Sequence, residues 1–307
     1  MAIKYKASKN IKQKKEKIKS KKEFWRIFAI EGSLFLITSI LAIVSAFELN
    51  KLVKAQKIYL PMISLQDFLF SFLFITFFVL FFIFFKKASK FKELIYKGFF
   101  LIICFWGGMT VLNLFMPTFG AVLIMGILII VWLEVPTVWV HDILIILGLA
   151  GVASFFGLGL EPSVVIILLV IFSFYDFIAV YKTKHMVAMA KEMIEKKVIL
   201  GFIVPKELKY FKDGLSKVKP GSNFLILGGG DVVFPNLLAV SVVPFGFLKA
   251  LIIVLFSLAG SLFSYWIFMY QKNPSSFRSS GQAKEPIPAL PPVALFAIIG
   301  YFVSLLF

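Results

Sequence analysis

The chain has 307 residues, of which 60% are apolar and 17% aromatic, and it carries a net charge of +17. This apolar content lies far above that of a water-soluble protein, so it excludes a soluble enzyme and predicts a membrane protein. A transmembrane β-barrel is excluded as well, because its strands would appear as alternating segments of about ten residues.

Unbroken apolar runs follow one another along the whole chain. A helix needs about 20 such residues to cross about 30 Å of hydrocarbon. Nine runs qualify, and the fourth is short because Glu134 and Pro136 end it. The runs are 25–48, 63–85, 98–117, 119–135, 143–160, 163–181, 222–243, 245–270 and 287–307. We therefore predict an all-α polytopic membrane protein with nine transmembrane helices.

The basic residues predict how these spans are oriented. Residues 1–24 are rich in Lys, and cytoplasmic segments of membrane proteins carry an excess of Lys and Arg. With the N-terminus in the cytoplasm, only four of the 33 basic residues fall outside the cell: Lys51, Lys54, Lys57 and Lys249. We therefore expect a multi-pass protein of the cell membrane, with its N-terminus cytoplasmic and its C-terminus extracytoplasmic. The first run is too long for the apolar core of a cleavable signal peptide, so we expect it to remain as a span.

Several other kinds of partner and site are disfavoured. The Lys-rich start lacks the interleaved aromatic residues that stack on bases, so we expect it to contact the lipid bilayer and no nucleic acid. Cys104 is the single cysteine, which rules out an intrachain disulfide and favours a small buried hydrophobic role. His141 and His185 stand apart from other possible ligands. We expect no metal and no other cofactor.

The chain divides into four parts. A basic segment, 1–24, precedes six spans over 25–181, a polar loop over 182–221 and three further spans over 222–307. In the loop, five apolar residues recur at helical spacing and predict an amphipathic helix along the membrane surface: Met186, Met189, Ala190, Met193 and Ile194. We expect this Met-rich stripe to serve packing.

Acidic residues within apolar runs need a reason, because a charge inside a membrane is costly. Five of them lie near the ends of runs, where reaching out to the interface explains them: Glu31, Asp67, Glu134, Asp142 and Glu161. For Glu31 and Asp67 a position facing an internal cavity remains open.

Asp176 and Asp231 cannot be explained in this way. Apolar residues flank both of them, and they lie about 8 Å and about 13 Å from the cytoplasmic ends of spans that run in opposite directions. Neighbouring helices would bring the two carboxylates face to face. Such a pair shares one proton and titrates as a unit. That is the working state of an aspartic protease, in which the ionised member activates a water and the protonated member assists the carbonyl.

Two further sequence features accompany the aspartates. Gly228, Gly229 and Gly230 precede Asp231, weaken helix formation and leave room for water and for substrate backbone, although close helix packing is an alternative role. The stretch PIPALPP, 286–292, begins the last run and leaves backbone groups without helical partners. A plain helix start at the interface explains this stretch equally well. The exposed backbone suggests that an extended substrate strand pairs near one of these motifs.

In this order, the three motifs resemble those of the presenilin and signal peptide peptidase family of intramembrane aspartyl proteases, and of its microbial presenilin homologues in particular. The family patterns are YD in the sixth span, GxGD in the seventh and PAL at the ninth. They correspond here to Tyr175-Asp176, Gly228-Gly229-Gly230-Asp231 and Pro288-Ala289-Leu290.

The resemblance implies that Asp176 and Asp231 are catalytic, and that Pro288, Ala289 and Leu290 shape the active site and engage substrate. It also implies transmembrane proteins or peptides as substrates, and no obligate partner subunits, as for microbial homologues. The variable position of GxGD is often Leu in the family and is Gly229 here, which affects substrate preference. A transporter or channel that uses the two aspartates as a cation or proton relay is the alternative, followed by a non-catalytic scaffold.

Overall fold

The computed structural model describes residues 2–57, 63–71, 73–74, 77, 89–219, 223–270 and 286–307. The predicted second span, 63–85, therefore lies largely outside the described residues. The part that is described is built mainly of helices, and a small sheet lies among them.

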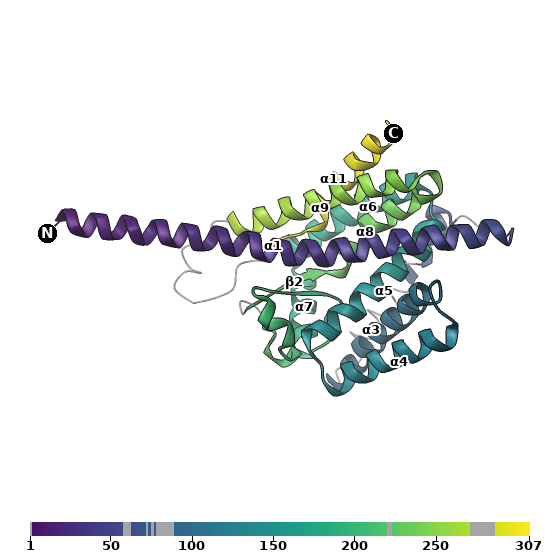
Figure 1. Cartoon of the computed structure of the whole chain (residues 1–307), viewed down its shortest axis with the longest axis horizontal. Helices are drawn as coiled ribbons and strands as arrows, with labels where there is room; N and C mark the ends of the chain where they lie inside the picture. The colour runs from purple at the N-terminus through teal and green to yellow at the C-terminus, as the bar shows by residue number, and fades with distance from the viewer. Residues whose placement is uncertain are drawn as a thin grey trace.

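The first helix, α1 (Ala2–Ala55), is one continuous helix of 54 residues. At 1.5 Å per residue it is about 80 Å long. Figure 1 shows it in purple, running across the whole molecule with its N-terminal end projecting beyond the other elements. The basic segment 1–24, which we expected to precede the first span, is thus the start of the same helix. In its apolar part, Ile27, Phe35 and Ile43 are buried against the rest of the fold.

Helices form most of the remaining structure. They are α3 (Ser89–Leu112), α4 (Thr118–Glu134), α5 (Val138–Leu158), α6 (Pro162–Phe177), α7 (His185–Glu195), α8 (Gly229–Ser241), α9 (Phe247–Tyr270) and α11 (Leu290–Ser304). In Figure 1, α9 and α11 lie on one side of α1, and α5, α3 and α4 lie on the other. Helix α1 packs against both α5 and α9.

Apolar helices in the described part of the chain suit a membrane. Five are long and apolar enough to cross one, judged by length and composition: Lys22–Ala55, Glu93–Leu112, Val138–Leu158, Pro162–Lys182 and Phe247–Tyr270. Three shorter apolar helices are Thr118–Glu134, Gly229–Phe245 and Leu290–Ser304. Large apolar side chains such as Ile102, Phe119 and Leu248 are exposed on the outside of the bundle. Lipid is the solvent in which such an exposed surface is stable.

The region between α6 and α8 contains the largest departure from the predicted elements. A π-helical turn, Ile178–Lys182, extends α6, and α7 follows it. Strand β1 (Gly201–Pro205), two short 3₁₀ turns (Leu208–Lys212 and Leu215–Lys217) and strand β2 (Phe224–Gly228) come next. A third 3₁₀ turn, Val243–Phe245, follows α8. The run 222–243 is therefore not one helix, because its first part is a strand.

The two strands pair antiparallel and form a two-stranded sheet. The register places Gly201 opposite Gly228, Ile203 opposite Ile226 and Pro205 opposite Phe224. The paired ends Gly201 and Gly228 thus lie where β2 enters α8. A β-carbon at Gly201 would collide with the carbonyl oxygen of Leu227, so this position requires glycine.

Candidate active site

Asp231 lies where the sheet meets a helix. Strand β2 ends at Gly228, which is the N-cap residue of α8, and Asp231 falls in the first turn of that helix. The run therefore changes from strand to helix just before the carboxylate. The free N–H groups and the dipole of a helix N-terminus stabilise negative charge close by. The sequence-based depth of about 13 Å assumed a continuous helix and does not apply to this geometry.

Asp176 lies near the C-terminal end of α6, two residues before the π-helical turn that begins at Ile178. Its side chain is buried, at 5% exposure. The backbone N–H of Leu290, the first residue of α11, donates to Asp176 Oδ2 at 3.3 Å. Pro291 and Pro292 have no N–H, so the N–H of Leu290 is the donor that this helix end offers. Asp176 thus caps α11 from another helix.

The two aspartates lie near enough to interact electrostatically. Helices α6, α8 and α11 pack against one another around them. One turn away from each carboxylate, Phe172 of α6 stacks on Phe234 of α8, with ring centroids 4.4 Å apart. This stacked pair fixes how the two helices face each other, and thereby how the two carboxylates face each other.

The three glycines before Asp231 have different surroundings. Gly228 is close to the carboxylate, because a β-carbon there would lie 3.0 Å from Asp231 Oδ2. Gly229 is buried, and its N–H donates to the carbonyl oxygen of Leu200 at 3.0 Å. A β-carbon at Gly229 would also lie 3.0 Å from that oxygen, so a larger residue needs the chain before β1 to shift. Gly230 is exposed.

The proline motif lies beside the aspartates, although most of it precedes the last helix. Pro288 is buried, Ala289 is the N-cap residue of α11, and the helix begins at Leu290. Through its backbone N–H, Leu290 joins this motif to Asp176. Tyr175 is 51% exposed and lies on a neighbouring face of α6, so its side chain points away from the buried face that carries Asp176.

A cavity of about 530 Å³ lies beside these residues. Its walls come from α1, α7, α9, both strands and the stretch before α11. From β2 the lining includes Leu225, Ile226 and Leu227, and from the proline motif it includes Ala289. The cavity therefore extends along β2 up to the segment that carries Asp231.

Two acidic residues that we expected at the membrane interface are buried instead. Glu31 is 6% exposed and lines the cavity, where its Oε1 accepts a hydrogen bond from Ser261 Oγ at 2.8 Å. Asp142 is 2% exposed in the first part of α5, a helix that starts five residues earlier than its apolar run. The explanation by reaching out to the interface is wrong for both, and for Glu31 the alternative left open, a position facing an internal cavity, is confirmed. Glu134, Glu161 and Asp67 are exposed.

His141 and Asp142 hold the sheet against α5. The backbone N–H of Ile203 donates to Asp142 Oδ1 at 2.9 Å, and His141 Nε2 lies 3.2 Å from the carbonyl oxygen of Gly201 and donates to it. His141 is fully buried and stacks on Phe100. From the sequence, His141 was noted only as standing apart from possible metal ligands, whereas in the structure it binds β1 to α5. Because β1 sets the register of β2, these two side chains position the segment that leads to Asp231.

Replacing Asp142 tests this role. In Asp142→Leu the N–H of Ile203 stays buried without an acceptor, which costs about 1–3 kcal/mol. We expect Asp142→Leu to lower the melting temperature and the cleavage rate. Asp142→Asn keeps an acceptor oxygen at the same place and is the matched control. Equal melting temperatures for the two variants, measured by thermal unfolding in detergent, would contradict the role assigned to this hydrogen bond.

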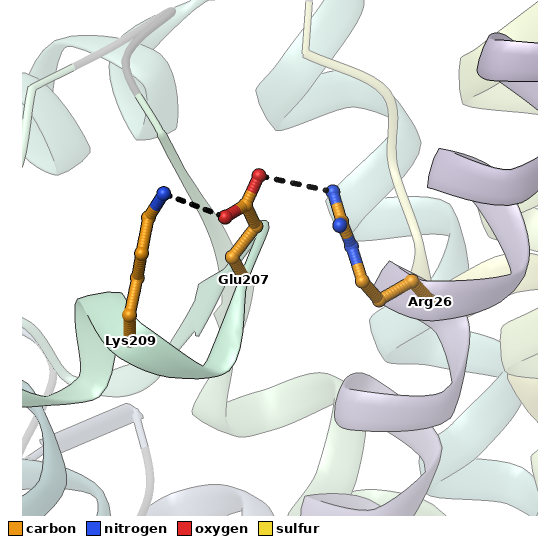
Figure 2. A network of polar contacts seen from close by, with 3 residues as sticks. All are labelled: Arg26, Glu207 and Lys209. Carbon is orange, nitrogen blue, oxygen red and sulfur yellow. Dashed lines mark ion pairs between the residues drawn. The ribbon is translucent and has the colours of Figure 1, made fainter.

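Ion pairs on the surface join the loop after β1 to α1. Figure 2 shows Glu207 between Arg26 and Lys209, with Nη2 of Arg26 at 3.6 Å and Nζ of Lys209 at 2.8 Å from the carboxylate oxygens. The hydrogen bond and the negative charge of Glu207 raise the pKa of the Lys209 ammonium above its ordinary value. All three side chains are exposed, so the network adds little to the free energy of unfolding. It does link the loop after β1 to α1.

No group of three or more His, Cys, Asp or Glu residues that could hold a metal occurs among the described residues. Cys104 is buried in α3, away from the aspartates. Two carboxylates supported by helix N-termini, next to a cavity lined by a strand edge, are suited to acid–base catalysis on an extended chain.

Comparison with known proteins gives a consistent result. Residues 32–307 match the family model described as "Signal-peptide peptidase, presenilin aspartyl protease". The chain is similar to the structure of a presenilin family intramembrane aspartate protease in space group C222, with 25% sequence identity and a TM-score of 0.56. That match covers 91% of this chain and 98% of the other. A structure with the same description in space group P2 gives 26% identity, a TM-score of 0.50 and coverages of 90% and 96%. A search of curated proteins gives no significant match.

Proposed function

Because the chain belongs to the signal-peptide peptidase and presenilin family of aspartyl proteases, we propose that Asp176 and Asp231 are its catalytic pair. The chain is an intramembrane aspartic protease, and its substrates are membrane-spanning segments of other proteins. The observation that supports the assignment is that the two carboxylates lie near enough to interact electrostatically, each at a helix N-terminus: Asp231 in α8 and Asp176 at α11.

The pair hydrolyses a peptide bond with one water. The ionised carboxylate takes a proton from the water as its oxygen attacks the scissile carbonyl carbon. The protonated carboxyl donates a hydrogen bond to the carbonyl oxygen, and a proton then passes to the leaving amine nitrogen as the C–N bond breaks. No metal is needed, because the carboxyl pair supplies both the base and the acid.

Two helix N-termini support the negative charge that this cycle requires. The Leu290 N–H donates to Asp176 and remains in place whichever carboxylate is ionised. Asp231 benefits from the free N–H groups of the first turn of α8. Fixed donors of this kind stabilise developing charge without reorganisation during the reaction, which is the usual basis of electrostatic catalysis.

Among the described residues β2 pairs with β1 alone, and its other edge is the proposed binding place for an extended substrate. Strand β2 pairs with β1 on one side, and Leu225, Ile226 and Leu227 line the cavity. An unpaired strand edge is a template for adding a further strand. A helical substrate hides its carbonyls in hydrogen bonds, and pairing with β2 would hold it unwound next to Asp231. Gly228, Gly229 and Gly230 then give the backbone room to approach, and Ala289 of the proline motif lines the same cavity. We propose that Pro288 and Leu290 hold this motif in place, and that Tyr175 flanks the site from the exposed side of α6.

The arrangement in the membrane is part of the proposal. We infer nine spans, a cytoplasmic N-terminus and an extracytoplasmic C-terminus, because this arrangement leaves only four of the 33 basic residues outside the cell. The loop that carries α7 and β1 then faces the cytoplasm. We further propose that the chain acts without obligate partner subunits, so that purified protein in lipid vesicles is active.

A transition-state analogue tests the catalytic mechanism. In one arm, purified protein is incubated with a transmembrane peptide, and mass spectrometry locates the cut within the apolar segment. In the other arm, the same peptide carries a hydroxyethylene group in place of the scissile amide. We expect this analogue to inhibit cleavage with an affinity at least about 100-fold above that of the parent peptide, because its hydroxyl replaces the attacking water between the carboxylates.

The matched control is a peptide with a methylene group in place of the hydroxyl-bearing carbon. It has the same length and shape but offers no hydroxyl, so we expect it to bind no better than the substrate. If both peptides inhibit equally, or if a chelator and not the hydroxyl analogue stops cleavage, the carboxyl-pair mechanism is wrong.

A further inference from the structure

A further buried carboxylate, that of Glu31, lies close to Asp231. Glu31 belongs to α1, is 6% exposed, and lies near enough to Asp231 for the two charges to interact. Within the described part of the chain, its carboxylate accepts a hydrogen bond from Ser261 of α9. A carboxylate offers about four acceptor positions, and one hydroxyl fills one of them. A buried charge that is incompletely paired is costly, so its retention in the cavity wall needs an explanation.

The surroundings of Glu31 form a polar patch in an otherwise apolar cavity. Ser264 and Tyr265 of α9 line the same cavity, and the charge of Glu31 also acts on Tyr265. Tyr265 is 6% exposed, and its hydroxyl has no hydrogen-bond partner among the described residues. The Glu31 carboxylate, which can accept further hydrogen bonds, and the Tyr265 hydroxyl, which has no partner among the described residues, therefore line one cavity. A ligand with several hydrogen-bond donors could bind to both groups.

Charge along α1 indicates which ligand fits. Glu23, Ile27 and Glu31 are four residues apart and line the cavity from one face of the helix. The two carboxylates are about 12 Å apart along the axis, with Glu31 at the end near Asp231. Lys191, Lys206 and Lys219 also line the cavity, but they belong to the loop side, where Lys191 and Lys219 are exposed. The deep end is thus negative and the outer end positive.

We propose that the cavity contains a specificity subsite in which the Glu31 carboxylate, with Ser261 and Tyr265 beside it, binds a cationic side chain of the substrate, that of Lys or Arg. This inference rests on the proposed roles of Asp176 and Asp231. An ammonium or guanidinium group supplies the donors that Glu31 and the Tyr265 hydroxyl lack. Its long apolar stem suits the cavity wall formed by Ile27, Leu227 and Ala289.

The subsite lies on a definite side of the cut. Strand β2 leads from the loop to Asp231, so a substrate strand paired with it extends from the scissile bond back toward the loop. Alternate side chains of that strand point into the cavity. We therefore expect the cationic residue within the first few residues on the loop side of the cut, at one of the alternate positions whose side chains point into the cavity.

A pair of peptide series tests the subsite. Each peptide carries a single Lys, or a single Met of similar length, at successive positions on the loop side of the mapped cut, and kcat/KM is measured for cleavage at the same bond. For the protein with Glu31 we expect the Lys peptide to exceed the Met peptide by about tenfold or more at one position. In Glu31→Gln, which keeps the size and an acceptor for Ser261, we expect this ratio to fall to about one.

Glu48→Gln is the matched control, because Glu48 is an exposed carboxylate on the same helix that pairs with Lys51. We expect it to keep the Lys/Met ratio of the parent protein. The inference is overturned if no position favours Lys, or if Glu31→Gln lowers cleavage of both peptides while their ratio stays the same. The second result would mean that Glu31 only joins α1 to α9.

A binding experiment separates this inference from the catalytic assignment. Fluorescence anisotropy gives Kd for the labelled Lys and Met peptides with Asp231→Asn and with the double variant Asp231→Asn, Glu31→Gln. We expect a Lys preference of about tenfold in the first and none in the second. A preference that survives the double variant overturns the subsite. Continued cleavage by Asp231→Asn would instead refute the catalytic pair.

Discussion

Asp176→Asn and Asp231→Asn are each expected to lower kcat by more than about 10³-fold, and the double variant is expected to be no slower than either. Asn has the size of Asp but can neither take the proton of the attacking water nor pass a proton to the leaving amine. Because the two carboxylates act as a unit, losing one removes nearly all of the catalytic effect. The measurement is the rate of peptide cleavage by purified protein in lipid vesicles.

The control for this prediction is Glu134→Gln. It removes an exposed carboxylate at the end of α4 and is expected to leave the rate unchanged. Thermal unfolding of each variant must show an intact fold, since Asp176 also caps α11. Asn keeps an acceptor oxygen for the Leu290 N–H, so we expect the melting temperature of Asp176→Asn to change little. Cleavage that persists in either Asp variant contradicts the catalytic assignment.

Gly201→Ala is expected to have the second largest effect, although Gly201 belongs to none of the three family motifs. Its β-carbon would collide with the carbonyl oxygen of Leu227 in the paired strand. The strands must separate at the end where β2 enters α8, which moves the segment that carries Asp231. We expect a loss of about 1–3 kcal/mol in the free energy of unfolding and a fall in kcat of at least about tenfold.

Gly98→Ala is the matched control for this steric argument. Gly98 lies inside α3, and a β-carbon there meets no atom within 4 Å. Alanine favours helix over glycine by about 1 kcal/mol, so we expect Gly98→Ala to be as stable as the parent protein or more stable. Unfolding and cleavage curves for the two variants provide the comparison. If Gly201→Ala behaves like Gly98→Ala, the contact between the strands does not constrain the site.

The short sheet was the main feature that sequence reasoning missed. GFIVP and FLILG are each five residues long and lie close to longer apolar runs, so a strand and the start of a membrane helix are hard to tell apart. Gly201 beside a short apolar stretch was the available signal. The pairing itself depends on contacts between residues 19 to 27 positions apart, which periodicity does not record.

The buried acidic residues show a second limit. Glu31 and Asp142 lie toward the ends of apolar runs, just as the exposed Glu134 and Glu161 do. Distance from the end of a run does not say whether a helix face meets lipid, water or protein. That depends on the neighbours: Ser261 of α9 for Glu31, and the N–H of Ile203 in β1 for Asp142.

The membrane class and the family follow from the sequence alone, and the sequence also singled out Asp176 and Asp231 as the proposed pair, because composition and isolated charges in apolar runs are local properties with large energetic costs. How these residues are supported depends on the tertiary structure. Only packing brings the Leu290 N–H to Asp176, pairs β1 with β2 ahead of Asp231, and places Glu31 in the wall of the cavity that extends along β2. Each of these contacts joins segments far apart in the chain, and their free energy depends on geometry that no short stretch of sequence contains.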